Sequence, residues 1–578
     1  MIVSSAQQLD MKDGVQLRTY YESLRAQLEG ERSSWMGHWQ QLAKHILPRN
    51  QRFNYSSSNR GERLDTSIVD NTATIAHRTL RAGLAASICS PTRKWRKTKT
   101  NDRELNEQKD VKIWLEHMDQ VVDEALLKSN FYQTAHQHLG DMGLYGTSAF
   151  SIMEDEETDF RCYPWPIGSY CIAGNEARRI DLHMRTVQMT VRQIVGEFGF
   201  DNCSQQVQQM YTTNTGGQKE NWYPVIHIVH RNGYLGGNNL LPDQKPWASI
   251  WYELGAFGND KQSSADYGLL RKSGFYECPI IASRWDVVGE DFYGISPGMD
   301  ALGDTMGLQH AQKRKMEAID KMVKPPMVAS PSMLNQKMTL LPGDITFADT
   351  REGNNGFKPA FEMRFDVSDA VIDIRDHQRR INDAMYVNLF LMLANSDRRE
   401  VTAEEIRAKQ EEKMLVIGPV LERSTDEFLA PAMRRVIGIL SRKGKFKAPP
   451  EVLRGKKITF EFSSILAQVQ RLMGVANLDR FMATVGQEAA VNQGIFDLVD
   501  LDAVARTYAD LLDVPGVTMR DEKEVAAIRQ QKQLAAQQAQ QAENAQKLAM
   551  AAKNLSGTDT SGQNGLTDLI HARTGLGA

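Results

Sequence analysis

Two long helical stretches separated by a short, turn-rich insert constrain this chain more than any other feature. The first stretch runs from Pro297 to Val323, begins with a proline, and ends at Lys324-Pro325-Pro326. The second runs from Val367 to about Ala394. The insert, 325–366, is interrupted by proline and glycine and predicts short strands over 338–341, 344–348 and 357–361. At 1.5 Å per residue the first helix would be roughly 40 Å long, so we expect an antiparallel helical hairpin with a small β tip.

The residues before this hairpin indicate an α+β protein that is predominantly helical. Apolar residues recur at three- and four-residue steps over 14–48, 65–88 and 106–143, which predicts three helices. Short β-prone runs follow, interrupted by one helix over 191–198, and we interpret 146–290 as an α+β domain with an antiparallel sheet. The runs are 148–153, 160–172, 180–190, 225–230, 249–254 and 275–283.

After the hairpin, residues 395–401 form a polar interruption. Thr402-Ala-Glu-Glu405 then predicts a helix start, because Thr402 can cap free N–H groups while Glu405 reaches back. That helix extends to about Leu440, with an expected break near Gly418-Pro419. A strand over 457–462 and more helix through the 510s follow. Residues 517–556 contain neither glycine nor proline and are rich in alanine and glutamine, so they predict a long helix that needs neighbours, and 557–578 predicts a flexible tail.

Charge and composition exclude several classes of protein. The 578 residues include 69 Lys+Arg and 72 Asp+Glu, for a net charge of −3, which argues against a tight, global nucleic-acid binder. No stretch reaches the roughly 18–20 consecutive apolar residues of a membrane span, and the first residues lack a basic region followed by an apolar run. We therefore expect neither a membrane partner nor secretion. The five cysteines never form a CxxC pair, which predicts free thiols in a reducing compartment.

The catalytic and metal-binding patterns of the sequence do not indicate an enzyme. The P-loop and HExxH patterns are absent, and the pairs His136/His138 and His38/His45 lack the spacing of ligands on one helical face. We expect no catalytic residues, no metal site and no cofactor. The acidic groups 155–157 and 404–405 are interpreted as a solvated loop and a helix N-terminus. The alternative is a metal-dependent nuclease that would use Asp155 or Glu157.

Two basic runs leave alternatives open. Lys313-Arg314-Lys315 lies mid-helix beside Glu317 and Asp320, which favours a solvated face over a phosphate-facing role. Arg398-Arg399 lies in the polar interruption between long helices, where side chains can point into open space. A simple solvated loop is slightly favoured there.

Three segments in a fixed order resemble the portal, or head-to-tail connecting, proteins of short-tailed bacteriophages. They are Arg81-Ala-Gly-Leu-Ala-Ala-Ser-Ile-Cys-Ser-Pro-Thr-Arg-Lys-Trp95, Tyr293-Gly-Ile-Ser-Pro-Gly-Met-Asp300 and Arg399-Glu-Val-Thr-Ala-Glu-Glu-Ile406. Each is weak alone, but the order of parts matches over about residues 15–510. The resemblance implies a non-enzymatic ring, usually of twelve subunits, at one capsid vertex of the virion, through which double-stranded DNA enters and later leaves.

The resemblance also implies a division into regions. Residues 1–296 and 402–465 correspond to the wing, 297–324 and 367–394 to the stem helices, and 325–366 to the clip. Residues 395–401 correspond to the tunnel loop, 466–516 to the crown, and 517–578 to a C-terminal helix and tail. Residues 517–556 are shorter than the helical barrel of some relatives, so whether they form a barrel stays open.

Residue roles and partners follow from this division. The DNA-proximal loop residues are Asn395, Ser396, Asp397, Arg398 and Arg399, and the channel-facing stem residues are Lys313, Arg314, Lys315, Arg379 and Arg380. Docking through the clip is assigned to Met338, Thr339, Asp344, Phe347, Phe357 and Phe361. The implied partners are further copies of the chain, the terminase large subunit, tail adaptors, and major capsid and scaffold proteins, with assembly in the host cytoplasm. The alternative outside this family role is an internal scaffold or tail-adaptor protein.

Overall fold

In the residues that the computed structural model describes, most of the chain forms helices, together with three sheets and one short β hairpin. The described residues are 14–48, 68–213, 217–232, 245–255, 268–329, 357–359, 367–394, 417–456, 458–462, 465–489, 498–512, 514, 518, 520 and 522–556. The predominantly helical α+β class predicted from the sequence is confirmed. The chain divides into two compact units. The first comprises Met1–Lys99, His117–Ala448 and Ile458–Leu478, and the second comprises Thr100–Glu116, Pro449–Lys457 and Asp479–Ala578.

Helices α2 (Thr72–Ile88) and α5 (Phe131–Tyr145) pack together at the centre of the first unit. Their buried residues, with the second half of α1 (Gly14–His45), belong to the largest hydrophobic core. Apolar residues at helical spacing in each segment predict this arrangement, because a stripe on each helix must be covered by another element.

A five-stranded antiparallel sheet has the strand order β4-β5-β6-β7-β8. The first half of α1 covers one face, where Leu17, Tyr21 and Leu24 join a core with Met184 and Ile228. The short helices α6 (Val191–Phe198) and α7 (Gln205–Thr212) contribute to a separate core with the sheet. The strands are β4 (Tyr170–Gly174), β5 (Ile180–Thr190), β6 (Trp222–Arg231), β7 (Trp247–Glu253) and β8 (Arg271–Phe275).

Two smaller sheets complete the β structure of the first unit outside the hairpin. One has the order β3-β2-β9, and the other pairs β1 with β12, which are distant in the sequence. The helix after residue 417 continues through a π-helical turn, Thr425–Leu429, into α13 (Ala430–Arg442). The strands are β1 (Arg96–Thr100), β2 (Thr147–Asp155), β3 (Asp159–Trp165), β9 (Ile280–Arg284) and β12 (Ile458–Phe462).

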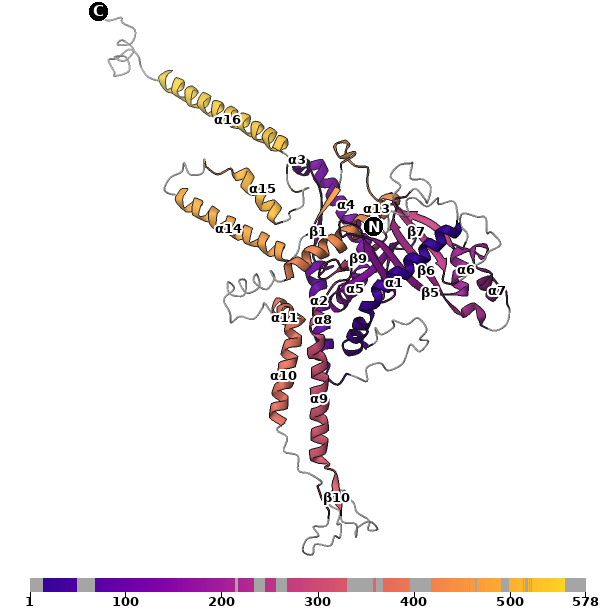
Figure 1. The fold of residues 1–578 in the computed structure, drawn as a ribbon. Coiled ribbons are helices and arrows are strands. Elements are labelled where there is room, and N and C mark those ends of the chain that lie inside the picture. Colours follow the sequence, from indigo (N-terminus) through magenta and orange to yellow (C-terminus); the bar gives the residue numbers. More distant parts are fainter. Residues whose placement is uncertain are drawn as a thin grey trace, which may run out of the picture. The chain divides into compact units, whose positions relative to one another are not determined.

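The predicted helical hairpin is present, and its two long helices run side by side (Figure 1). The short helix α8 (Pro297–Asp300) leads into α9 (Leu302–Val323), and the return is made by α10 (Val367–Ala384) and α11 (Val387–Ala394). Between them, β10 (Met327–Ala329) pairs antiparallel with β11 (Phe357–Pro359). The predicted strands 338–341 and 344–348 lie outside the described residues, and of the strand 357–361 only Phe357–Pro359 is described.

The second unit is mainly helical. It contains α3 (Arg103–Glu107), the start of α4 (Lys109–Lys128), α15 (Leu501–Leu511) and the long α16 (Glu522–Ser556). Val111 and Leu115 pack against Leu453 in a small core. The long helix predicted over 517–556 is thus confirmed from Glu522 onward. Helix α14 (Ile465–Ala489) continues from the first unit into the second.

Two of the predicted helices have different limits, and in each case a polar side chain is the reason. The helix predicted from residue 65 begins only at Thr72, because the Asp70 carboxylate accepts hydrogen bonds from the Thr72 backbone N–H and hydroxyl. The helix predicted over 106–143 is divided into three. Its last break follows Asn130, whose side-chain amide exchanges two 2.8 Å hydrogen bonds with the Cys162 backbone.

The predicted break near Gly418-Pro419 lies at the edge of the described residues, which resume at 417, so it stays a prediction. Within the described helix an irregularity lies at the π-helical turn before Pro431, which cannot donate the usual hydrogen bond four residues back.

Two predicted strand runs are in fact pairs of strands. Residues 160–172 are split by a turn at Pro166–Ser169, where Gly168 has φ +82°. Residues 275–283 are split before Pro279, so β8 and β9 belong to different sheets. The helix α7 was not predicted.

Candidate functional site

The α9–α10 hairpin contains the described part of the predicted channel surface. The two helices approach closely at Gly307, where an added Cβ would lie 2.9 Å from Cε1 of His377. His377 Nδ1 lies 3.0 Å from the Asp304 carboxylate, and Arg380 is 3.7 Å from the same carboxylate. The absence of a side chain at Gly307 thus allows the two helices to approach closely, and the contacts of Asp304 with His377 and Arg380 hold them together.

Burial decreases along α9 from its first turns to its end. Leu302, Thr305, Leu308 and Gln309 are buried, whereas after residue 310 only Ala318 is. Large apolar side chains remain exposed further along the hairpin. They are Met316 (53% exposed), Ile319, Met322, Val323 (72%), Val328 and, on α10, Ile372 (64%).

The predicted channel-facing cations are all on this hairpin, but they do not form one positive surface. Lys313 and Arg314 are exposed and Lys315 is half-buried; within the described residues none of the three has an ion-pair partner. Arg379 and Arg380 are exposed and lie near Asp383 (3.8 Å) and Asp376 (2.5 Å) on their own helix.

Charges on the two helices balance. Helices α9 and α10 together carry seven lysines and arginines and seven aspartates and glutamates. A surface with this composition offers no strong attraction for a polyanion.

Asp70 joins the start of α2 to both long helices. Its Oδ2 accepts 2.9 Å hydrogen bonds from Gln312 on α9 and Gln378 on α10. Gln309 on α9 accepts from the N–H groups of Val69 and Asp70 and donates to the Asp70 carbonyl. Burial alone would raise the pKa of Asp70, but the hydrogen bonds from Thr72 and the two glutamines lower it below its ordinary value. The carboxylate is therefore held in its charged form at the joint.

The segment Tyr293–Asp300 forms the turn into the hairpin. Gly294 and Gly146 lie so close that a Cβ on either would meet the other's carbonyl oxygen. Ser296 donates a 2.7 Å hydrogen bond to the Leu144 carbonyl and caps α8 by accepting from the Met299 N–H. The glycine and serine of this motif are thus explained by contact with the end of α5.

The segment Arg81–Trp95 contacts α11, the last helix of the hairpin. The Phe390 ring of α11 lies against Gly83, in the space that a side chain at residue 83 would occupy. Arg81 Nε donates a 3.0 Å hydrogen bond to the His136 carbonyl on α5. This motif therefore determines how closely α11 approaches α2, and it also joins α2 to α5.

A backbone break separates α10 from α11. Tyr386 has φ +55°, a left-handed conformation that non-glycine residues adopt only at a cost. Its ring packs 6.1 Å from Trp285, and Asn388 bonds back to Asp383 across the break. The predicted continuous helix 367–394 is therefore wrong at this point, and tertiary contacts determine the direction of α11.

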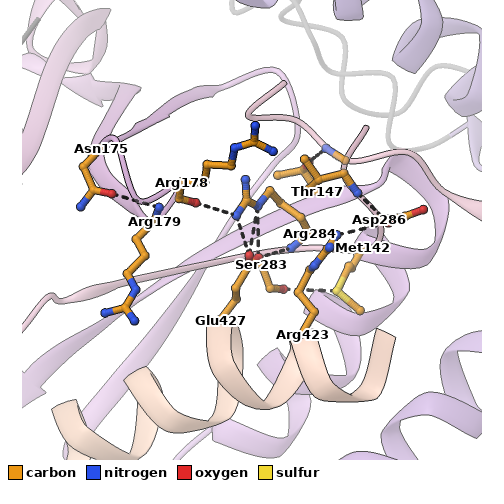
Figure 2. Close-up of polar contacts among 12 residues, drawn as sticks. Met142, Thr147, Asn175, Arg178, Arg179, Ser283, Arg284, Asp286, Arg423 and Glu427 are labelled. Carbon is orange, nitrogen blue, oxygen red and sulfur yellow. Dashed lines mark hydrogen bonds and ion pairs between the residues drawn. The ribbon is translucent and has the colours of Figure 1, made fainter. Parts of the chain in front are cut away.

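A partly buried ion pair connects strand β9 to the π-helical turn. Figure 2 shows Arg423 and Glu427 reaching from one helix toward Asp286 and Arg284. Glu427 accepts hydrogen bonds from the backbone N–H of Arg284 (3.0 Å) and from its guanidinium (Nη2, 2.6 Å). Arg284 in turn donates to the carbonyl of Arg178. A rare helical geometry thus places the Glu427 carboxylate beside this strand.

Several predicted site residues lie outside the described residues. They are the loop residues Asn395, Ser396, Asp397, Arg398 and Arg399, and Met338, Thr339, Asp344, Phe347 and Phe361 of the clip. Phe357 is placed at the start of β11. Within the described part of the chain, no group of three or more metal-binding side chains comes together, and no helix has the length and apolarity to cross a bilayer.

Sequence reasoning missed Asp70 and its three glutamines, since they are as far as 308 residues apart. It also assigned no role to Gly83. An isolated glycine within a helical pattern was the available signal, because such a glycine often marks a close approach.

Comparisons with known proteins now decide the family. The family model described as bacteriophage head to tail connecting protein matches residues 18–519. The chain belongs to this family. It is 40% identical to the portal protein of Salmonella phage epsilon15 over 548 residues, which is 95% of this chain and 97% of that one. It is 36% identical to the probable portal protein of Bordetella phage BPP-1 over 549 residues, again 95% and 97% of the two chains.

The family resemblance predicted from the three motifs is thereby confirmed, and the chain is a head-to-tail connecting protein of portal type. Among solved structures, a chain from the virion of a native gene transfer agent particle is 13% identical and covers 77% of this chain and 94% of its own, with a TM-score of 0.35. That likeness is too distant to support any step of the argument.

Proposed function

We propose that this chain is the repeating subunit of a ring, usually of twelve copies, at one vertex of a phage capsid. Double-stranded DNA passes through the ring during packaging and again during ejection. Family membership and the α9–α10 hairpin support this role. The ring is a structural, non-enzymatic part of the virion and is assembled in the host cytoplasm.

The observation that carries the proposal is the combination of balanced charge and exposed apolar side chains on one hairpin. Seven basic and seven acidic residues let a polyanion slide, because each fixed phosphate contact would add a salt-dependent attraction. Exposed Met316, Val323 and Ile372 supply apolar surface for packing against the same hairpin of the next copy. A head-to-tail interface that closes under rotation produces a ring.

The regions take the roles that the family resemblance implies. Residues 297–324 and 367–394 form the stem, with Lys313, Arg314, Lys315, Arg379 and Arg380 facing the channel among acidic neighbours. Residues 1–296 and 402–465 form the wing, 466–516 form the crown, and 517–578 form a C-terminal helix and tail.

Two further regions act on partners of the ring. The tunnel loop 395–401 approaches DNA through Arg398 and Arg399. The clip, 325–366, docks the terminase large subunit and later the tail adaptors, using Met338, Thr339, Asp344, Phe347, Phe357 and Phe361. Capsid and scaffold proteins surround the assembled ring.

Negative-stain imaging and mass measurement of the purified full-length chain test the proposal. We expect closed rings with a central opening and a single mass that is a whole multiple of the 65.1 kDa subunit. A chain that stays monomeric over a range of salt and protein concentrations would overturn it.

A further inference from the structure

A row of side chains crosses the five-stranded sheet at a single register position. Tyr170, Arg185, His227, Trp251 and Arg271 are directly opposite one another in neighbouring strands. Directly opposite residues in an antiparallel sheet project from the same face. The row therefore brings two arginines, a histidine and aromatic rings together on one face, far along the sequence from the hairpin.

Arg185 is surrounded by aromatic rings. Its Cζ lies 4.7 Å from the centroid of Trp165 and 5.6 Å from that of Trp251. His227 stacks on Trp251 with centroids 3.8 Å apart and an interplanar angle of 9°. Such contacts favour the cation, but they leave the five in-plane N–H donors of a guanidinium without acceptors.

The two arginines of the row differ in one respect. Arg271, which also lies over Trp251, has its Nη1 2.9 Å from the carboxylate of Glu197. The side chain of Arg185 makes neither a hydrogen bond nor an ion pair with any described residue, and its Nε is buried without a partner among them. Nδ1 of His227 is also buried without a partner. A mostly buried cation without an anion is costly, and native structures seldom leave one so.

The charges of the row indicate what kind of group would bind to it. Burial lowers the pKa of Arg185 to about 10, which still leaves it charged at neutral pH. Burial, together with the charges of Arg185 and Arg271, holds the pKa of His227 well below its ordinary value, so this ring adds no charge. One positive charge therefore remains unmatched, and one negative charge would satisfy it.

We propose that Arg185 is the anchor of a binding site for one carboxylate group. A guanidinium pairs with a carboxylate through two parallel N–H to oxygen bonds, a planar arrangement that occupies little space. The indoles of Trp165 and Trp251 crowd the guanidinium, which favours a small planar anion over a phosphodiester chain. The carboxylate comes from an acidic side chain of an adjoining copy of this chain or from a free small carboxylate ion, and only the first source rests on the proposed ring.

Thermal unfolding of the full-length subunit in sodium acetate, against sodium chloride of equal ionic strength, tests this site. A ligand that binds only the folded state stabilises it in proportion to the logarithm of its concentration above Kd. We expect the Tm of the parent chain to rise with the logarithm of the acetate concentration once this exceeds Kd. In Arg185→Gln the acetate concentration needed for the same rise should be at least tenfold higher, and Arg185→Lys should also weaken the effect because lysine lacks the planar fork.

Arg271→Gln is the matched control, because it removes a cation from the same row that already has its carboxylate. It should keep the acetate response of the parent chain. Absence of an acetate-specific rise in the parent chain, an unchanged rise in Arg185→Gln, or a larger rise with inorganic phosphate would each overturn the proposal.

The same titration on assembled rings distinguishes the two sources of the carboxylate. A response in separate subunits that disappears in rings identifies an acidic side chain of the neighbouring copy, which then already fills the site. A response of equal size in both states identifies a free carboxylate ion.

Discussion

Gly83 and Phe390 are in direct contact, with the Phe390 ring in the space that a Cβ on residue 83 would fill. Gly83 lies in the middle of α2, where glycine is unfavourable for helix formation, and Phe390 lies in α11, a few residues before the proposed tunnel loop. The absence of a side chain at residue 83 thus allows α11 to lie directly on α2.

Replacing Gly83 with alanine should therefore destabilise the subunit. The added methyl group forces Phe390 to move, and overpacking of this kind costs about 1–3 kcal/mol, which outweighs the gain of about 1 kcal/mol in helix propensity. Urea unfolding measures the difference. Gly37→Ala is the control, because Gly37 lies in α1 with nothing within 4 Å of an added Cβ, and it should be neutral or stabilising. Equal effects of the two substitutions would contradict the packing argument.

How much of the fold could be predicted from the sequence depends on how far apart in the chain the interacting residues are. The helix Val191–Phe198 follows from local signals, since its Thr190 and Gln193 form a capping box. The hairpin follows from its proline limits and helical periodicity. In contrast, the breaks at Asn130 and Tyr386 depend on partners far along the chain, Cys162 and Trp285. A local pattern contains no information about such partners.

In the candidate site, too, some residues could be predicted from the sequence and others could not. The charged residues of the α9–α10 hairpin could be predicted because their positions on two long helices follow from periodicity alone. The contacts of Asp70 with Gln312 and Gln378 could not, because glutamines at such positions are ordinary surface residues until the fold brings them to one carboxylate. Likewise, nothing in the sequence around Arg185 indicates that its side chain lacks an acidic partner among the described residues.

The ion pair between Arg284 and Glu427 should contribute to stability more than an exposed pair does. Their side chains are only 7% and 19% exposed, and Glu427 also accepts a hydrogen bond from the Arg284 N–H. Glu427→Ala leaves a mostly buried cation and an N–H unpaired, for an expected loss of about 3 kcal/mol. Arg379→Ala breaks a pair that is 80% and 54% exposed and should change stability by less than about 0.5 kcal/mol. Similar losses for the two variants in urea unfolding would refute this ranking.

Asp141 should make the stability of the subunit depend on pH. Burial raises its pKa to about 7, although the charge of Arg81 and a hydrogen bond from Gln137 oppose the shift. From about pH 4 to pH 7 the unfolded chain releases this proton while the folded chain keeps it, so the unfolded state binds fewer protons and stability falls as pH rises. Above pH 7 both states are ionised, and the loss is complete.

Asp141→Asn removes this titration. The variant should gain stability relative to the parent chain as pH rises from 4 to 7, by a few kcal/mol in total at about 1.4 kcal/mol per pKa unit. Urea unfolding at pH 4.5, 6 and 7.5 measures the gain. A difference between the two proteins that is the same at all three pH values would show that Asp141 does not titrate in this range.

Exposed apolar residues on the hairpin should be needed for ring assembly. Ile372 is 64% exposed on α10, and a glutamate there would place a charge in the proposed interface between copies. We expect Ile372→Glu to give a folded subunit, by circular dichroism, that forms few or no rings in negative-stain images. Leu127→Glu is the control, because Leu127 is similarly exposed (61%) on α4 and outside the hairpin. Rings of normal number from Ile372→Glu would exclude this residue from the interface.

Arg398 and Arg399 should act on DNA and not on assembly. Both belong to the polar interruption after α11, and their charges are the feature that a passing phosphate backbone would meet. We expect the double variant Arg398→Ala, Arg399→Ala to form rings of normal mass but to alter the amount of DNA packaged or retained, measured as DNase-protected DNA per particle. Arg192→Ala, which removes an exposed cation from α6, is the control and should leave both properties unchanged. If the double variant fails to assemble while the rings that do form package normally, then the two arginines have a structural role instead.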